Sequence, residues 1–188
     1  MFTAARAIYH ERGWTRFSYE EVARRSGVGK GSLYLRWPNK AALLVDAIRD
    51  EQPFTAAIDT GSLRGDLIEF ATRYNSYVTS DEGDVVYRLL VESRLYPDLR
   101  ECLVSSPYAQ HIQDLRALIR RGLSRGELPE GTSIALVGDL VAGAVATHAR
   151  ATPENLRDRI ETTIYLTTIV DTVLAGVTCR DSDRSDGR

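Results

Sequence analysis

Apolar residues recur along this chain at intervals of three and four positions, and they do not alternate with polar residues between turn signals. The first spacing places side chains on one face of an α-helix, whereas alternation would indicate half-buried strands. The pattern therefore predicts an all-α protein. It indicates helices over residues 2–12, 18–26, 29–35, 40–51, 62–79, 83–95, 107–125, 132–150 and 153–176.

Residues that start and stop helices support the first four of these segments. Gly13 ends the first, and Ser18 with Glu21 forms a capping box at the start of the second. Pro38 interrupts the chain after the third segment, and Asn39 can cap the fourth. Three helices in residues 1–35 followed by a break are typical of a small, separate head.

The chain is predicted to divide into a head, a body and a tail. Pro53 and the glycine-bearing stretch 59–65 indicate a junction, so we expect a DNA-binding head over 1–52 and a helical body over 53–177. The last residues, 178–188, are polar and lack an apolar face, which favours disorder. The first 52 residues carry nine basic and six acidic side chains, whereas the remainder has an acidic excess. A basic head on an acidic body suits a protein that binds nucleic acid.

The segment 18–40, SYEEVARRSGVGKGSLYLRWPNK, has the organisation of a helix-turn-helix. Between Val22 and Val45 there are five basic residues and no acidic one. Glycine inside a helix costs about 1 kcal/mol relative to alanine, so Gly29 and Gly31 at the start of a short helix need a reason. A slim helix can approach base edges in the major groove of DNA, which gives such a reason.

Candidate DNA contacts divide into a reading helix and its phosphate anchors. Lys30 can donate to a guanine edge or a phosphate, and Leu35 either contacts a thymine methyl group or packs inside the head. The full predicted set is Ser18, Tyr19, Gly29, Lys30, Gly31, Ser32, Tyr34, Leu35, Arg36 and Lys40. The expected core of the head is Val22, Ala23, Val28, Leu33, Trp37, Leu44 and Ile48.

The residues AARAIYHERGW (4–14) and SYEEVARRSGVGKGSLYLRWPNKAALL (18–44) resemble the helix-turn-helix of the tetracycline-repressor (TetR) family of bacterial regulators. The run Arg36-Trp37-Pro38 is similar to that of one subgroup. The resemblance implies a head joined through its fourth helix to a larger body that binds a small-molecule effector and forms a homodimer. It also implies a ligand-responsive transcriptional regulator, here expected to be a cytoplasmic repressor of a double-stranded DNA operator.

The expected dimer uses the helices at 132–150 and 153–176. The last helix repeats apolar and small residues at intervals of four and three, as in an interhelical seam. These residues are Leu156, Ile160, Thr163, Thr167, Val170 and Leu174. Small residues between Gly138 and Ala146 would allow a neighbouring helix to approach closely. Both stripes could instead be internal core. A dimer suits a pseudopalindromic operator, because one short helix reads few bases.

Candidate effector contacts lie on the middle and later helices. Tyrosines offer an apolar ring with one polar tip, which suits a largely apolar ligand cavity. The candidates are Tyr74, Tyr77, Tyr87, Glu92, Tyr108, His111 and His148, although such tyrosines and lone histidines are more often ordinary core or surface residues. Histidine and cysteine spacings typical of metal sites do not occur, so we expect neither a metal nor a cofactor.

Two other functions remain open from the sequence. A transcriptional activator could carry the same head. A helical enzyme with a basic patch would need paired catalytic groups, which the scattered histidines and acids do not suggest. No apolar run reaches the length of a membrane span and no signal peptide is recognisable, so no membrane partner is expected. Cys102 and Cys179 are expected to be reduced thiols, with a redox switch as the alternative.

Overall fold

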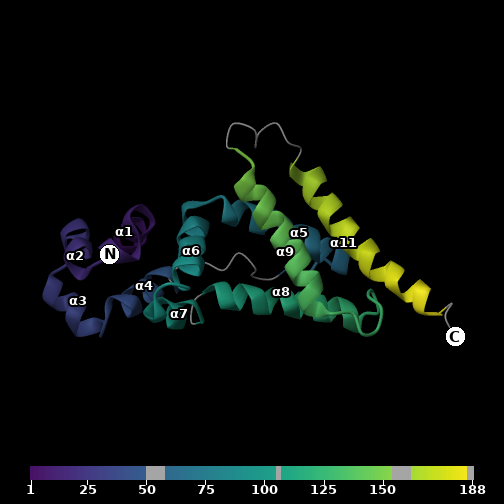
Figure 1. Cartoon of the computed structure of the whole chain (residues 1–188), viewed down its shortest axis with the longest axis horizontal. Helices are drawn as coiled ribbons and strands as arrows, with labels where there is room; N and C mark the ends of the chain where they lie inside the picture. Colours follow the sequence, from purple (N-terminus) through teal and green to yellow (C-terminus); the bar gives the residue numbers. More distant parts are fainter. Residues whose placement is uncertain (50–57, 105–106, 154–161, 186–188) are drawn as a thin grey trace. The chain divides into compact units, whose positions relative to one another are not determined.

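The structure, a computed structural model, describes residues 1–49, 58–104, 107–153 and 162–185. Over these ranges it consists of helices without strands, so the predicted all-α class is confirmed (Figure 1). The helices are α1 Phe2–Arg16, α2 Tyr19–Ser26, α3 Lys30–Arg36, α4 Lys40–Arg49, α5 Leu63–Val78, α6 Asp81–Glu92, α7 Pro97–Val104, α8 Pro107–Ser124, α9 Ile134–Ala151 and α11 Thr162–Ser185.

Two segments differ from the predicted helices. Helix α7 was not expected; it begins at Pro97, a residue that suits a first helical position, and it buries Leu99 completely. Helix α11 continues to Ser185, so the prediction of a disordered tail from 178 was wrong for most of that tail. The Thr178 hydroxyl donates to the Leu174 carbonyl inside this helix. Residues 154–161 of the predicted last helix lie outside the described residues, as do 186–188.

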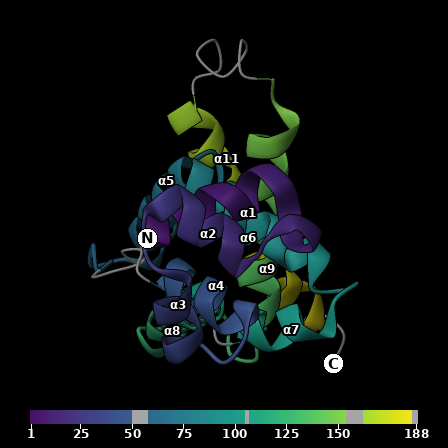
Figure 2. The same ribbon diagram turned by 90° about the vertical axis from the view of Figure 1, so that its left-hand side faces the viewer.

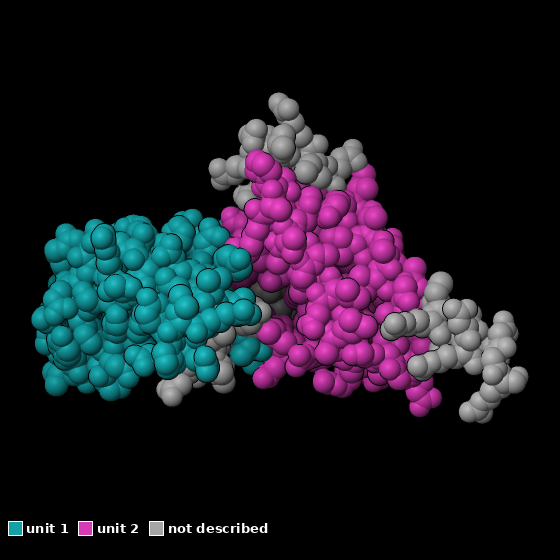
Figure 3. All heavy atoms as spheres, in the orientation of Figure 1, with its two compact units in different colours: residues 1–53, 80–110 teal, residues 54–79, 111–188 magenta. Residues whose placement is uncertain are grey.

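The chain forms two compact units (Figure 3). The first contains α1–α4 together with α6 and α7, and the second contains α5, α9, α11 and most of α8. The spatial division therefore differs from the division by sequence at residue 52, because α6 packs against α1 and α7 packs against α4. The chain passes from one unit to the other at three points, after residues 53, 79 and 110, and the last of these lies within α8.

In the first unit α1 packs against α6 (Figure 2). A break in α1 at Gly13 lies at this contact. Gly13 has φ +68° and ψ −177°, a conformation open essentially to glycine alone. A side chain there would also overlap Arg88 and Glu92 of α6. The Glu92 carboxylate accepts the Trp14 N–H at 3.1 Å. The predicted stop at Gly13 is thus a kink, after which the helix continues for one turn.

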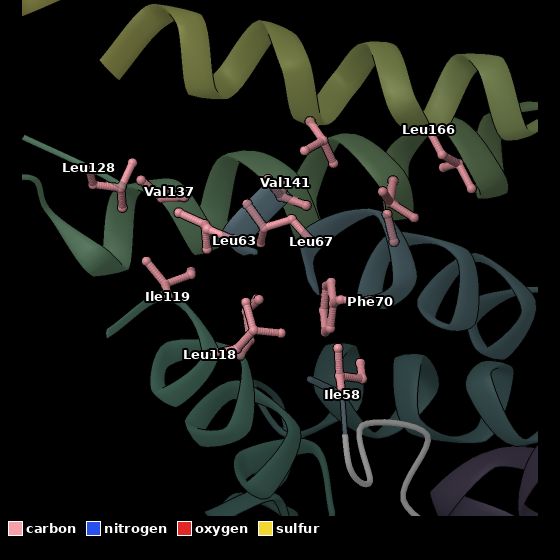
Figure 4. Packing of buried hydrophobic residues seen from close by; sticks show 14 residues of the cluster. Ile58, Leu63, Leu67, Phe70, Leu118, Ile119, Leu128, Val137, Val141 and Leu166 are labelled. Atoms are coloured by element: carbon pink, nitrogen blue, oxygen red, sulfur yellow. The ribbon is translucent and has the colours of Figure 1, made fainter. Parts of the chain in front are cut away.

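The core of the second unit is built from four helices (Figure 4). Each contributes apolar residues at the spacing of three or four that the sequence pattern predicts. They are Leu63, Leu67 and Phe70 from α5, Leu115, Leu118 and Ile119 from α8, Val137, Val141 and Val145 from α9, and Leu166 and Val170 from α11. Val170, predicted for an interface between subunits, is therefore internal core.

Helix α9 is long and apolar enough to cross a membrane by length and composition, contrary to the expectation from sequence. Two features of the second unit account for its composition. One face packs Val137, Val141 and Val145 into the core. A neighbouring face carries exposed Leu136 and Leu140. An apolar helix of a folded core passes the same length test, so this finding alone does not indicate a membrane span.

Candidate nucleic-acid interface

Helices α2 and α4 begin at the caps that the sequence predicts. The Ser18 hydroxyl accepts the Glu21 N–H at 3.3 Å, and Gly27 ends α2 in the left-handed conformation with φ +73°. Asn39 caps α4 by accepting the Ala42 N–H at 2.8 Å. The second half of the predicted capping box is replaced by ion pairs, since the Glu21 carboxylate binds Arg12 and Arg24.

Helix α3 presents most of its surface to solvent. Leu33 is its one buried residue, while Gly29, Lys30, Gly31, Ser32, Tyr34, Leu35 and Arg36 are exposed. A Cβ atom added to Gly31 would meet no atom within 4 Å. Leu35 is 91% exposed, so it does not pack inside the head. A short, slender and uncovered helix of this kind can enter a groove of duplex DNA.

Tyr19 supports α3 from beneath and does not lie on its exposed surface. It is 6% exposed, and its hydroxyl donates to the Trp37 carbonyl at 2.8 Å. Burial raises the pKa of the Tyr19 phenol, and the neighbouring Tyr34 adds to the shift. The Tyr34 ring lies against Tyr19 with 4.5 Å between centroids. The buried Tyr19 hydroxyl, which has a backbone partner, does not face DNA, so a phosphate contact at this position stays a prediction for the start of α2 and not for the phenol.

The side chain of Lys40 is directed toward the end of α1. Its ammonium donates to the Trp14 carbonyl at 2.9 Å and the Phe17 carbonyl at 3.1 Å, and it lies 4.0 Å from the centroid of the Trp14 ring. Burial lowers the pKa of Lys40, although the Asp98 charge opposes the shift. The structure thus gives Lys40 a role in packing the head, where the sequence predicted a phosphate anchor.

Replacing Lys40 by alanine is expected to lower the free energy of unfolding by about 1–2 kcal/mol, because charged hydrogen bonds and a cation–π contact are lost together. Urea denaturation followed by the fluorescence of the buried Trp14 and Trp37 measures this change. Lys30→Ala is the control, because Lys30 is exposed and should leave the urea midpoint unchanged. If Lys40→Ala left the stability unaltered and weakened DNA binding, Lys40 would be a phosphate contact, as the sequence predicted.

Glutamates pair with several of the basic residues that made this segment look cationic. Arg24 binds Glu21, and Arg25 binds Glu11 through two hydrogen bonds of 2.7 Å. Hydrogen bonding to Arg25 lowers the pKa of the Glu11 carboxyl. The charges of Arg24 and Arg25 therefore contribute less to an anion-binding surface than the number of basic residues in the sequence suggests.

The predicted core of the head is confirmed for most of its residues. Val22, Leu33, Trp37, Leu44 and Ile48 are buried. Ala23 and Val28 are half-buried at the surface of α2 and the turn that follows it.

The predicted effector residues in the second unit fall into two groups. Tyr77 meets the buried His111 edge to face, with 5.6 Å between ring centroids, and Tyr74 stacks on Phe70 at 5.4 Å. Burial lowers the pKa of His111 to about 4, although Asp114 opposes the shift, so this imidazole is neutral at physiological pH. His148 lies apart from them, stacked on Tyr165 of α11 at 3.8 Å.

Two of the other three predicted effector residues lie in the first unit. Tyr87 and Glu92 belong to α6 in the first unit, where Glu92 binds the backbone of Trp14. The side chain of Tyr108 lies outside the described residues, as do those of Cys102 and Cys179. Clusters of His, Cys, Asp or Glu that could hold a metal do not occur among the residues described.

A cavity of about 200 Å³ opens in the second unit beside Phe70. Its lining is Ile58, Phe70, Asp114, Leu115, Ala117, Leu118 and Arg121, which includes none of the predicted effector residues. The spacing of Asp114, Leu118 and Arg121 by four and three places them on one face of α8. That spacing was visible in the sequence, but nothing local distinguishes a cavity-lining face from an ordinary core face.

A buried carboxylate lies next to this cavity. Asp66 is fully buried, accepts the N–H of Thr60 at 2.6 Å and its hydroxyl at 2.8 Å, and binds the Arg121 guanidinium at 2.7 Å. Arg125 approaches the same oxygen at 3.4 Å. Burial acts to raise the pKa of Asp66, but these partners outweigh burial and lower it.

The exposed α3, its capped partner α2 and the helical body define a helix-turn-helix regulator of the TetR type. Two family models match the chain: residues 2–47 match "Bacterial regulatory proteins, tetR family", and residues 57–173 match "Tetracyclin repressor-like, C-terminal domain". The chain belongs to the TetR family of transcriptional regulators.

Individual relatives agree with this assignment. The HTH-type transcriptional regulator AqdR of Rhodococcus erythropolis is 31% identical over 74% of this chain and 67% of its own. The DNA-binding transcriptional repressor TetR of Mycobacteroides abscessus is 30% identical over 72% of each chain.

Solved structures share the fold. The TetR family transcription regulator SCO0332 has a TM-score of 0.66 and 25% identity over 94% of this chain and 95% of its own. The regulator FadR from Bacillus subtilis, solved in complex with stearoyl-CoA, also has a TM-score of 0.66, with 17% identity over 94% of this chain and 97% of its own.

Proposed function

We propose that this regulator is a homodimeric repressor that binds a pseudopalindromic DNA operator through α3 and leaves it when a small molecule occupies the body. The observation that carries the proposal is the exposure of α3 from Lys30 to Arg36, with Leu33 alone turned inward. We assign base contacts to Lys30, Ser32 and Leu35. Tyr34, Arg36 and the exposed backbone around Gly29 and Gly31 complete the surface, with Ser18 at its edge.

The proposed dimer interface uses the outer faces of α9 and α11. Leu136 and Leu140 are exposed one turn apart on α9, and Ile164 is 60% exposed on α11. A Cβ atom at Gly143 would meet no atom within 4 Å, so a helix of a second subunit could approach α9 closely there. TetR-family regulators usually act as dimers, which supports a second copy of this chain as the occupant of this face.

Replacing Leu140 by arginine is expected to weaken the dimer at least about tenfold, because a charge would be buried without a partner at the interface. Sedimentation equilibrium of the purified protein measures the dissociation constant. Arg116→Ala, at an exposed position on α8, is the control and should leave it unchanged. A Leu140→Arg protein that is as dimeric as the parent would place the interface elsewhere.

The effector is proposed to bind in the cavity beside Phe70 and Arg121, whose lining combines apolar side chains with one acidic and one basic group and so suits a small organic molecule with a polar end. The stearoyl-CoA complex of FadR supports a ligand-binding body in this fold. Helix α6 is the proposed transmitter, because it follows α5 directly in the chain and holds α1 through Glu92. Binding of effector and of DNA would be coupled reciprocally by about 1–3 kcal/mol, or roughly 5- to 150-fold in affinity.

The test begins with duplexes selected from a random-sequence pool by the purified protein. Thermal-shift screening of small molecules then identifies candidate effectors. The selected duplex should lose affinity when the effector is present, as measured by fluorescence anisotropy. An equal affinity with and without a stabilising small molecule would refute the effector mechanism, and a failure to enrich any duplex would refute sequence-specific DNA binding.

A further inference from the structure

An acidic side chain of α2 lies against the exposed surface of α3. Glu20, in the first turn of α2, forms an ion pair with the Lys30 ammonium. The Tyr34 hydroxyl donates to the same Glu20 oxygen at 3.5 Å, and the Lys30 nitrogen lies 5.6 Å from the centroid of the Tyr34 ring. The three side chains therefore form a cluster on the surface assigned to DNA.

Folding stability does not explain this cluster. The side chains of Glu20 and Lys30 are 56% and 49% exposed, and exposed ion pairs contribute little to stability. The hydrogen bond from Lys30 lowers the pKa of the Glu20 carboxyl, and the hydrogen bond to Glu20 raises that of Lys30, so both groups are charged at physiological pH. The two opposite charges are thus both present at the pH at which DNA is bound.

The pair has a direct consequence for DNA binding. Non-specific affinity arises from lysine and arginine side chains that neutralise phosphates and release counterions. A lysine already neutralised by a carboxylate gains less from a phosphate, and the carboxylate itself is repelled by the DNA backbone. A correctly placed base edge can replace Glu20 as the partner of Lys30, because it offers acceptors in fixed positions.

We propose that Glu20 is a specificity-determining residue that holds Lys30 away from phosphates, so that Lys30 contributes to binding on the operator and little on other DNA. The inference rests on the proposed DNA-binding function. Glu20 lowers the affinity for random sequence and thereby increases the ratio of specific to non-specific binding.

The experiment compares Glu20→Gln with the parent on two probes, a random-sequence duplex and the duplex selected from the random pool. Glutamine keeps the shape of the side chain and removes its charge. We expect Glu20→Gln to bind the random duplex about three- to tenfold more tightly, with a salt-dependence slope steeper by about one unit per subunit, since one more phosphate is neutralised. The affinity for the selected duplex should change less, so the specificity ratio falls.

Glu11→Gln is the matched control. It removes the same charge from the same head and releases Arg25, which belongs to the last turn of α2 and is not part of α3. An equal gain in both variants would show that net charge alone sets the affinity, and this would overturn the proposal. Melting temperatures of both variants should match that of the parent.

The same substitution in a protein that lacks the Lys30 charge tests the role of Lys30 itself. In a Lys30→Gln protein, Glu20→Gln should no longer steepen the salt dependence. A gain of the same size in that background would mean that Glu20 acts by repulsion and not by holding Lys30. A loss of affinity for the selected duplex in Glu20→Gln would instead identify Glu20 as a direct reader of a base, which also contradicts the proposal. If the parent binds neither probe, the proposed DNA-binding function fails, whereas an unchanged Glu20→Gln with a binding parent refutes this inference alone.

Discussion

A Gly31→Glu protein should lose DNA binding while remaining at least as stable as the parent. Position 31 faces open space in the free protein, so the added side chain meets no obstacle there. Glycine is a poor helix former, and its replacement inside α3 should raise the free energy of unfolding by up to about 1 kcal/mol. In a DNA groove the same side chain would collide with base edges and repel phosphates. We expect affinity for the selected duplex to fall at least about 100-fold, or about 2.7 kcal/mol.

Two controls separate the causes of this loss. Gly31→Ala adds one methyl group and should weaken binding less than the glutamate does. Gln113→Glu adds the same charge at an exposed position of α8 in the second unit and should leave affinity within about twofold. Anisotropy titrations give the affinities, and thermal unfolding gives the stabilities. A Gly31→Glu protein that still binds within about threefold of the parent would exclude α3 as the reading helix.

An Asp66→Asn protein should be destabilised by about 3 kcal/mol, the lower end of the range for breaking a buried ion pair by removing one partner. The asparagine can still accept from Thr60, but its amide group would face the guanidinium groups of Arg121 and Arg125. Both arginines are partly exposed, and solvent therefore moderates the loss. Urea unfolding followed by far-ultraviolet circular dichroism measures the change.

Asp171→Asn is the matched control, because Asp171 pairs with Arg64 in the same unit and both side chains are about half exposed. Its melting temperature should match that of the parent. Equal destabilisation by the two substitutions would show that the burial of Asp66 is unimportant.

The effect of Asp66→Asn should depend on pH with a defined sign. The pKa of Asp66 in the folded protein lies below its ordinary value of 3.8, so folding favours the ionised form. The stabilisation is complete above the unfolded pKa and is lost as the pH falls through the folded one. The difference between parent and variant should therefore be largest at neutral pH and shrink below about pH 3.8. A difference that grows on acidification would contradict the charged state assigned to Asp66.

Which side chains of the head are buried and which face solvent was harder to predict from the sequence than where its helices lie. The pattern predicted the helix-turn-helix and the exposed α3, because periodicity and caps act over a few residues. Tyr19 and Lys40 were predicted to face DNA since both follow the start of a helix. The structure turns both inward, onto Trp37 and onto the end of α1, and these partners lie 18 and more positions away in the chain.

Contacts between residues far apart in the sequence also limited the prediction of the cavity in the body. Its helices were located by their apolar spacing, but the cavity depends on which faces of α5 and α8 meet. Asp114 and Arg121 became candidates only when the structure placed them beside Phe70. Glu92, predicted for the effector, instead binds Trp14 in the first unit.

By itself the sequence determined the all-α class, most helix boundaries, the caps at Ser18 and Asn39, and the family, because these depend on local periodicity, local hydrogen bonds and a short motif. Only the tertiary structure decided that α6 and α7 belong to the same unit as the head. It also decided that the Lys40 ammonium donates to a carbonyl at the end of α1, and that Glu20 forms an ion pair with Lys30. Each of these contacts joins residues from separate helices, and the way helix faces meet is set by packing of the whole unit, which local sequence does not specify.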